Sequence, residues 1–482
     1  MHDSRMHGNP LVQEEAVRPL TPNPVTRAQL QMGSERVDST SDTPSKHTAG
    51  MASNVFVSVL TGGADRPYAF GLGSALMSKV AGLDLIVCDE LDGPPFQGHP
   101  HVNLLNLRGS VDPNVSALQK LSRVLAYYAR LLLYTLKAKP KVFHILWNNK
   151  FEWFDRTILM AYYKLLGKKL VLTIHNVNKK QRDASDTRLN RLTLRTQYGL
   201  ADHLFVHTEM MKDDLIRGFG VQPARITVIP FGINNSVPNT DLSVDEARTT
   251  LGLAKRAKVL LFFGHITPYK GLEFLIGAFH QLADRDPDYR LVIAGRPKNC
   301  EAYWATIRQS IETDVQHGRI VLQANFVPDE ETEIYFKAAD VLVLPYRNIY
   351  QSGVLFLGQS FGLPALVADV GSLKDDVIEG ETGFVFKPED PDDLARAIEI
   401  YFANDLYLRL PEKREAIRRH VETHHSWDAI GQTTVAVYDS LLKSAPPEST
   451  KAQTTSQSKS TEKPTSSQSD VPLQSNSSAG RL

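Results

Sequence analysis

The residues best suited to chemistry lie in two glycine-containing turns in the second half of the chain. The first, Gly264 to Gly271 (GHITPYKG), places Lys270 before a glycine after an apolar run. The second, Gln351 to Val354 (QSGV), follows the apolar run Val341 to Leu344. In both turns a strand pattern leads into a helical pattern, so backbone N–H groups at a helix start would face an anion. Lysine adds a full positive charge to the partial charge of the helix terminus. We therefore expect both turns to bind phosphate, and a diphosphate suits the pair.

Two residues of the second turn have separate expected roles. Ser352 is expected to cap the helix that follows, and Gly353 allows a ligand to approach the backbone closely. The structural alternatives are a solvated lysine in the first turn and a plain helix cap in the second. Neither turn has the Walker pattern, and no GxGxxG follows the first strand. An ATPase or a dehydrogenase is therefore poorly supported.

Two strand ends in the first half also carry candidate residues. Thr61, Gly62 and Gly63 follow the first apolar strand, and the sequence Thr173-Ile174-His175-Asn176 ends another. His175 is suited to hydrogen-bond a sugar hydroxyl, whereas a plain turn and a structural histidine are the alternatives. The basic residues Lys179, Lys180 and Arg182 come just after. They would attract a phosphorylated or lipid-diphosphate acceptor, with a solvated loop as the alternative.

Short apolar strands alternate with helical segments along most of the chain, which favours two parallel, doubly wound sheets. The expected strands are 54–60, 85–88, 142–146, 170–174, 203–206 and 226–229, then 259–263, 290–294, 320–324, 341–344 and 365–368. The expected helices include 116–137, 271–282, 391–402 and 428–442. The polar stretch 232–243 reads as a linker between the halves. Parallel strands place both phosphate turns along one sheet edge.

The helix expected over 116–137 has leucines at helical spacing. Leu118, Leu121, Val124, Leu125 and Leu132 are spaced for a single apolar face. The apolar part of this segment is too short to span a bilayer, and Arg130 interrupts it. We expect the stretch from Val124 to Leu136 to be a core helix; a membrane-facing surface helix is the alternative.

Composition sets outer limits on function. The chain has 482 residues and zero formal net charge, so no overall charge favours nucleic acid or an anionic membrane as the main partner. The only cysteines, Cys88 and Cys300, are far apart, which fits a reducing compartment. The first residues hold no apolar run of signal-peptide length. We expect a cytoplasmic protein, with peripheral contact at the cytoplasmic membrane face left open.

From about Val55 to Leu442 the chain resembles the retaining glycosyltransferases of the two-domain GT-B type, family 4. Lys270 stands where that family has the lysine of its Lys-Gly pair, and His265 stands where it usually has arginine. Ala339-Asp340-Val341, Val370-Gly371-Ser372 and Glu381-Thr382-Gly383 also match, as does the Thr-x-His-Asn at His175 and Asn176.

The resemblance implies an α/β GT-B fold in which two Rossmann-like domains with parallel doubly wound sheets face a central cleft. The implied organisation is a disordered tail over 1–52, an acceptor domain over 53–238, a nucleotide-sugar donor domain over 239–425, a helix over 426–443 that returns to the first domain, and a disordered tail over 444–482. The implied chemistry is metal-independent, retaining transfer of a UDP- or GDP-linked sugar to a glycan, lipid-linked or small-molecule acceptor, without a cofactor, in glycan or polysaccharide biosynthesis.

The resemblance also assigns roles to residues. His175 and Asn176 would be catalytic, and Gly62 and Gly63 would form a loop near the phosphates and the acceptor. The donor-binding residues would be Gly264, His265, Lys270, Gly271, Arg296, Val327, Gln351, Ser352, Gly353 and Val354. No metal ligand is expected: Asp375 and Asp376 lie in a helix-like run, and no Asp-x-Asp pair ends a strand.

The chain departs from the family at one important pair of positions. The family's two glutamates, eight residues apart, fall on Ile349 and Leu357 when counted back from Gly362-Leu363-Pro364. The sugar and ribose contacts would then come from Gln351 or from backbone groups. Two other interpretations stay open: a non-catalytic protein that binds sugar nucleotides on this fold, and a GT-B phosphorylase or synthase. Bound pyridoxal would identify a phosphorylase, and lack of turnover with mixed donors would identify the non-catalytic protein.

Overall fold

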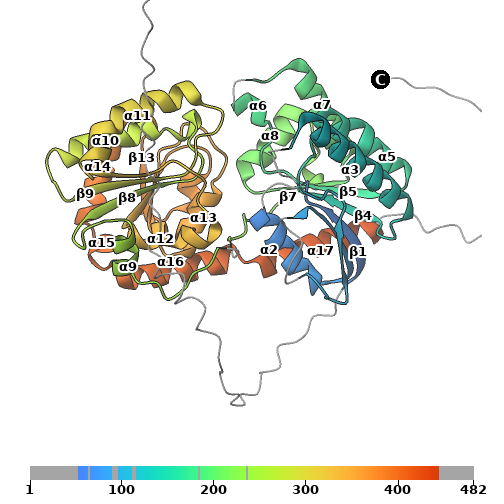
Figure 1. Ribbon diagram of the computed structural model, residues 1–482. Coiled ribbons are helices and arrows are strands. Elements are labelled where there is room, and N and C mark those ends of the chain that lie inside the picture. Colours follow the sequence, from blue (N-terminus) through green and yellow to red (C-terminus); the bar gives the residue numbers. More distant parts are fainter. Residues whose placement is uncertain are drawn as a thin grey trace, which may run out of the picture. The chain divides into compact units, whose positions relative to one another are not determined.

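The computed structural model describes residues 53–62, 66–89, 96–110, 115–182, 185–234 and 237–443. The tails expected over 1–52 and 444–482, and Gly63, lie outside these residues. The described chain contains two parallel sheets, each covered by helices on both faces (Figure 1). This is the two-sheet, parallel α/β architecture predicted from the alternation of strands and helices.

The seven-stranded sheet has the order β3-β2-β1-β4-β5-β6-β7, and every neighbouring pair is parallel. We call this sheet, with its helices, the seven-stranded domain. Its strands are β1 (Ser53–Leu60), β2 (Val80–Val87), β3 (Val102–Asn106), β4 (Val142–Ile145), β5 (Lys169–Thr173), β6 (His203–Val206) and β7 (Ile226–Val228). Its helices are α2 (Arg66–Met77), α3 (Ala117–Lys137), α4 (Glu152–Phe154), η2 (Asp155–Leu159), α5 (Met160–Leu165), α6 (Lys179–Arg182), α7 (Arg188–Leu200), α8 (Glu209–Phe219) and η3 (Pro223–Arg225).

The six-stranded sheet has the order β10-β9-β8-β11-β12-β13 and is also parallel throughout. With its helices it forms the six-stranded domain. Its strands are β8 (Lys258–Phe263), β9 (Tyr289–Ala294), β10 (Ile320–Gln323), β11 (Val341–Leu344), β12 (Ala365–Ala368) and β13 (Gly383–Phe386). Its helices are α9 (Val244–Thr250), η4 (Pro268–Lys270), α10 (Leu272–Ala283), α11 (Glu301–Gln316), α12 (Asp329–Ala338), α13 (Gly353–Ser360), η5 (Leu373–Asp376), α14 (Pro391–Ala403), α15 (Asp405–Leu408) and α16 (Leu410–His424).

All eleven strands expected from the sequence are present, with ends shifted by a few residues. The sequence analysis missed β3 and β13. Strand β3 (VNLLN) is largely half-buried, and β13 (GFVF) is four residues long, so neither gives a strong apolar signal. Both are edge strands of their sheets.

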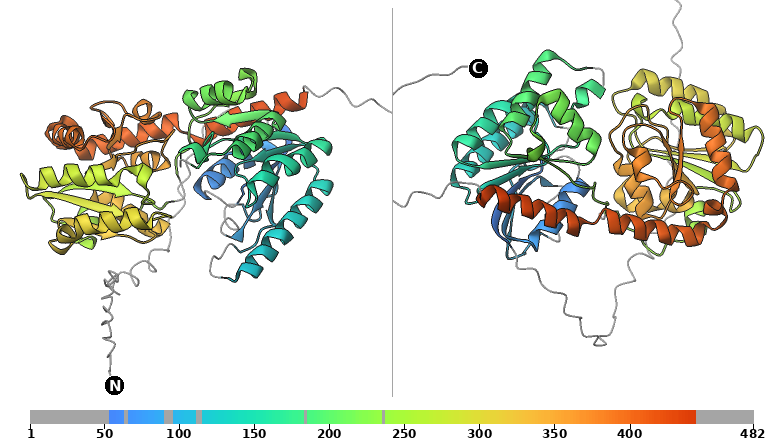
Figure 2. Two further views of the ribbon diagram at one scale, coloured as in Figure 1. Left: turned by 90° about the horizontal axis from the view of Figure 1, so that it is seen from above. Right: turned by 180° about the vertical axis from the view of Figure 1, so that it is seen from behind.

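Helix α17 (Trp427–Lys443) packs against α2 and β1 of the seven-stranded domain, as the views in Figure 2 also show. Its buried residues Ile430 and Tyr438 share an apolar core with Val57 of β1. The hydroxyl of Tyr438 lies 2.6 Å from Nδ1 of His144, whose Nε2 lies 2.8 Å from the hydroxyl of Thr173. A fully buried histidine thus links α17 to two central strands.

Helix α3 presents a different face to the core from the one expected. Its buried residues are Tyr127, Tyr128, Leu131 and Thr135. Leu118, Leu121 and Leu125, which belong to the predicted apolar face, are instead 80%, 47% and 55% exposed. The two tyrosines contribute more apolar area than the leucines do and keep their hydroxyls bonded, Tyr127 to Asn149 and Tyr128 to Asp155. This packing leaves a row of leucines on the surface.

Candidate functional site

Both phosphate-binding turns predicted from the sequence lie where the strand order of the six-stranded sheet reverses. The chain moves outward from β8 through β9 to β10, then returns to place β11 on the other side of β8. The turn Gly264–Gly271 follows β8, and the turn Pro345–Ser352 follows β11. Ligands of open parallel sheets bind outside the carboxyl ends of the strands at this reversal. The topology therefore puts the two turns side by side at the position favoured for ligand binding.

Glycines make this close approach possible. Gly271 has a φ of +63°, and a Cβ atom placed on it would lie 2.1 Å from the carbonyl oxygen of Pro345. The backbone N–H of Arg347 donates to the carbonyl of Tyr269 at 2.8 Å. Any side chain at residue 271 would push these two turns apart.

Lys270 reaches the start of α13 from the neighbouring turn. Its side chain is buried, and Nζ lies 5.3 Å from the ring centre of Tyr346. A Cβ on Gly264 would lie 2.9 Å from this Nζ and 3.5 Å from Cγ2 of Val354. Gly264, Lys270 and Val354 therefore converge. Lys270 ends the short helix η4, and α10 begins only at Leu272, so the lysine does not occupy the first position of α10 as the sequence had predicted.

Ser352 precedes α13 as predicted, but its expected capping bond is absent. It is buried at the N-cap position and makes no side-chain cap hydrogen bond. Its hydroxyl instead lies 3.5 Å from the hydroxyl of Tyr346. Burial turns the serine toward the tyrosine and away from the helix start, so the serine oxygen does not occupy the first N–H groups of α13. Gly353, the first helical residue, is exposed.

A cluster of positive charge surrounds His265 in the same turn. Burial first, and then Lys298, Lys270 and Arg296, lower the pKa of His265 to about 4. The turn after β9 is held beside it: Ile266 N–H donates to the Arg296 carbonyl at 3.0 Å, and Lys298 N–H donates to the Ile266 carbonyl at 3.1 Å. At neutral pH the imidazole is uncharged and three cations remain. This field suits an anion more negative than a single phosphate monoanion.

The positions of Val327 and Gln351 relate less directly to the candidate phosphate site. Val327 is buried in the apolar core, so its side chain is directed into the protein. Gln351 is half-buried in the turn before α13. Of the two positions that carry glutamate in the family, Leu357 is on the buried face of α13 and Ile349 lies in the turn after β11. Sequence analysis missed Tyr346 and Lys298, whose only signal was that each follows a strand end.

The seven-stranded sheet has its own strand-order reversal between β1 and β4. Gly62 follows β1 with a φ of +62°, and a Cβ there would lie 2.5 Å from the carbonyl oxygen of Trp147, which follows β4. Residue 62 must therefore be glycine to pack on Trp147.

His175, after β5, lies against the same tryptophan within a group of aromatic rings. Its ring stacks on Trp147 at 4.2 Å with an interplanar angle of 2°, and Tyr68 contacts it edge-on at 4.6 Å. Nδ1 of His175 lies 3.3 Å from Nε2 of His207, whose Nδ1 lies 3.3 Å from the carbonyl of Ile229. Sequence analysis missed Trp147, Tyr68 and His207, because they come from separate segments of the chain.

This chain of contacts determines the tautomer of His175. Burial lowers the pKa of His207 to about 4, and burial followed by the His207 ring lowers that of His175 well below its usual value, so both rings are neutral at pH 7. His207 must donate its Nδ1–H to the Ile229 carbonyl, so its Nε2 accepts from Nδ1–H of His175. Nε2 of His175 is then a bare acceptor, and among the described residues neither it nor Oδ1 of Asn176 has a hydrogen-bond partner. Hydroxyl groups of a bound molecule would satisfy both.

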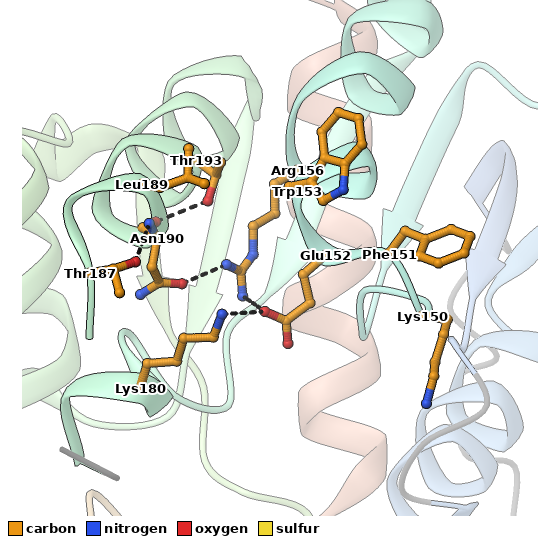
Figure 3. A pocket seen from close by; sticks show the side chains of 10 residues that line it. All are labelled: Lys150, Phe151, Glu152, Trp153, Arg156, Lys180, Thr187, Leu189, Asn190 and Thr193. Atoms are coloured by element: carbon orange, nitrogen blue, oxygen red, sulfur yellow. Dashed lines mark hydrogen bonds and ion pairs between the residues drawn. The ribbon is translucent and has the colours of Figure 1, made fainter. Parts of the chain in front are cut away.

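A pocket of about 350 Å³ opens beside the segments that follow β4 and β5 (Figure 3). Glu152 lies between two cations in it, 3.0 Å from Arg156 and 3.6 Å from Lys180. Arg156 also donates to Oδ1 of Asn190 at 2.8 Å, while Lys150 points away from this network. The pocket therefore has three cations against one carboxylate, with Trp153 and Leu189 as apolar walls.

Two family models match the chain. The model described as "Glycosyl transferases group 1" matches residues 243–423, and the model described as "Glycosyltransferase Family 4" matches residues 68–237. Together they cover the six-stranded domain and most of the seven-stranded domain.

Similar proteins are known both as sequences and as structures. A D-inositol 3-phosphate glycosyltransferase of Corynebacterium diphtheriae is 29% identical over 274 residues, covering 55% of this chain and 62% of the relative. One of Corynebacterium glutamicum is 31% identical over 277 residues, covering 56% and 65%. The chain thus spans less than two thirds of the length of these curated relatives.

The structural likeness concerns the fold. Sucrose-phosphate synthase from Thermosynechococcus elongatus has a TM-score of 0.63 at 19% identity, with 82% of this chain and all of that chain covered. Anabaena Alr3699/HepE in complex with UDP and glucose has a TM-score of 0.61 at 16% identity, with 80% and 100% covered.

Proposed function

Because the chain belongs to the glycosyltransferases of group 1 and family 4, we propose that it is an enzyme that transfers a sugar from a nucleoside diphosphate sugar to an acceptor. One observation carries the proposal. The ammonium of Lys270, the exposed start of α13 and the cations around His265 converge where the strand order of the six-stranded sheet reverses. A diphosphate is the ligand whose charge and two phosphoryl groups match this arrangement.

The same groups would assist the reaction. As the bond between C1 of the sugar and the phosphate oxygen breaks, negative charge grows on the leaving diphosphate. Lys270 and the backbone N–H groups of α13 would stabilise that charge. The acceptor oxygen forms the new bond to C1, and its proton passes to the leaving diphosphate. His265 is neutral at pH 7 because its pKa is about 4, so it would act as a hydrogen-bond partner and not as a cation.

His175 and Asn176 would orient the sugar or the acceptor in the seven-stranded domain. Their unpartnered Nε2 and Oδ1 atoms both accept hydrogen bonds, and sugar hydroxyl groups donate them. Stacking on Trp147 and contact with Tyr68 keep the His175 ring fixed. The cationic pocket lined by Lys150, Arg156 and Lys180 favours an acceptor that carries phosphate, in keeping with relatives named for D-inositol 3-phosphate.

We further propose front-face transfer with retention at C1 and without a metal ion. The family resemblance suggests both features. Transfer should persist in excess EDTA. Loss of transfer under chelation, restored by Mg²⁺ or Mn²⁺, would contradict the metal-free mechanism, and an inverted anomeric product would contradict retention.

Thermal-shift measurements with UDP, GDP, ADP and their free nucleosides test the donor site. A ligand at about 100 times its Kd adds roughly 2.7 kcal/mol to the free energy of unfolding. We expect a nucleoside diphosphate to raise Tm and the matching nucleoside to raise it much less. The apolar residues at the two glutamate positions, Ile349 and Leu357, favour a second candidate, a sugar-nucleotide-binding protein without turnover. Donor binding with no product across mixed donors and acceptors would select it.

A further inference from the structure

The seven-stranded domain carries a surface that the proposed chemistry does not use. Helix α3 exposes Leu118, Leu121, Leu125, Leu133 and Leu136 in a row at helical spacing. They are distinct from the residues of this helix that are buried, namely Tyr127, Tyr128, Leu131 and Thr135. A row of exposed leucines of this length is unusual on a protein surface and indicates a contact with an apolar partner.

Neighbouring helices extend this surface. The hydroxyl of Tyr162 in α5 donates to the carbonyl of Leu132 in α3 at 3.0 Å, so the two helices lie side by side (Figure 1). Helices α5 and α7 also contact each other. Further large apolar side chains are exposed on η2, α5 and α7, namely Ile158, Leu165 and Leu192. We call these residues, with the leucine row of α3, the leucine face.

Helix α3 belongs to a strongly basic segment of the chain. Residues 114–200 hold 17 Lys and Arg against four Asp and Glu, a net charge of +13 in a chain whose total is zero. Helix α3 itself contains no acidic residue. Within the described part of the chain, no acidic side chain pairs with Lys120, Arg130 or Lys137 of this helix. The face therefore presents uncompensated positive charge beside exposed leucine.

We propose that the leucine face docks the protein on an anionic lipid bilayer. An amphipathic helix with leucine on one side and Lys and Arg flanking it lies in the membrane interface, with its apolar side among the acyl chains. The positive charges are attracted to anionic headgroups. The helix would lie on the membrane and not cross it, since no helix among the described residues is long and apolar enough for a span.

Charge decides between a bilayer and a second copy of this chain. Two copies joined through this face would bring together Lys120, Arg130 and Lys137 of both copies, which like-charge repulsion opposes. An anionic bilayer neutralises the same charge. The observations therefore favour the lipid surface, and self-association becomes one outcome of the test.

The test is co-sedimentation of the full chain with vesicles, without donor or acceptor. We expect binding to phosphatidylcholine vesicles that contain phosphatidylglycerol, much weaker binding to pure phosphatidylcholine, and a loss of binding in high salt. The triple variant Leu118→Gln, Leu121→Gln, Leu125→Gln should lower the partition coefficient at least about tenfold, because three partly inserted leucines are lost. Each of Lys120→Gln and Lys137→Gln should lower it about fivefold.

A matched control distinguishes the leucine face from an exposed leucine elsewhere on the protein. Leu408 of α15 in the six-stranded domain is 68% exposed, and Leu408→Gln should leave vesicle binding unchanged. All these positions are exposed, so Tm should stay near that of the parent. The proposal is overturned if the parent binds no anionic vesicles, if the triple variant binds as well as the parent, or if the triple variant only abolishes a dimer seen by sedimentation. Because no substrate is present, these outcomes do not depend on glycosyl transfer.

Discussion

At the scale of single residues, burial determines which groups can act at the candidate donor site. Ser352 has the type and position of a helix cap, yet its buried hydroxyl lies beside Tyr346. Lys270 has the type of a solvent-exposed cation, yet its ammonium is enclosed between Tyr346 and Gly264 beside α13. A partly enclosed cation interacts with an anion more strongly than a solvated one does. Lys270 is therefore the residue whose removal should be most informative.

Lys270→Ala should weaken the binding of a nucleoside diphosphate by about 10- to 100-fold, since a hydrogen bond to a charged group contributes ~1.5–3 kcal/mol. Affinity for the bare nucleoside should stay the same. Calorimetric titration of both ligands measures the difference. Lys374→Ala, which removes an exposed lysine paired with Asp369 in the same domain, is the matched control. Equal weakening of diphosphate and nucleoside would place Lys270 away from the phosphates.

His175→Ala tests whether Nε2 of His175 accepts a hydrogen bond from a substrate. The substitution removes Nε2, so kcat should fall. The affinity of the protein for a nucleoside diphosphate, which is proposed to bind in the six-stranded domain, should be unchanged. His207→Ala should lower kcat less, because His207 acts through the orientation of His175. Steady-state kinetics together with diphosphate titration check both variants. A His175→Ala enzyme with the parent's kcat would remove His175 from the reaction.

At the scale of elements, one buried carboxylate connects the segments beneath the candidate donor site. Asp340, just before β11, accepts from Arg248 of α9 at 2.8 Å and from the backbone N–H of Val259 in β8 at 2.8 Å. Strands β8 and β11 flank the strand-order reversal. The carboxylate thus fixes the start of the two strands whose far ends carry Lys270 and Ser352.

Asp340→Ala should lower the free energy of unfolding by about 3–5 kcal/mol, because it leaves the charge of the buried Arg248 without a carboxylate partner. Asp245→Ala, which breaks the exposed pair with Lys255, should cost at most about 1 kcal/mol. Urea denaturation curves compare the two variants. If both variants lose the same stability, the buried pair contributes no more than a surface pair.

At the scale of the whole molecule, the distribution of charge matters more than its sum. Zero net charge gave no reason to expect an anionic partner, yet residues 114–200 carry +13 and the remainder carries the balancing negative charge. Burial also lowers the pKa values of several histidines. It lowers the pKa of His144 to about 3, and it lowers that of His203 and of His207 to about 4.

These buried histidines predict acid sensitivity. In the unfolded chain they bind protons below a pH of about 6.5, whereas in the folded chain His203 and His207 stay neutral until a pH of about 4 and His144 until about 3. Their stabilising effect is therefore complete above pH 6.5 and is lost as the pH falls from 6.5 toward 4. The free energy of unfolding should decrease over that range, and His203→Gln should make the decrease shallower. Denaturation curves at several pH values measure the slope; an unchanged slope in the variant would exclude His203 from the effect.

Eleven strands, the parallel architecture and the turns around Lys270 and Ser352 could be predicted from the sequence, because strand periodicity and glycine position are local properties. Strand order could not be predicted, because it depends on pairing between distant segments, and it is strand order that brings the Gly264 and Pro345 turns together. The same limit applies to His175: its neighbours Trp147, Tyr68 and His207 come from distant segments, so its tautomer depends on contacts that no local pattern contains. Helix α3 shows the limit most clearly. Its periodicity predicted an apolar face, but the sheet selected the tyrosine side, since only packing against distant residues determines which side of a helix is buried.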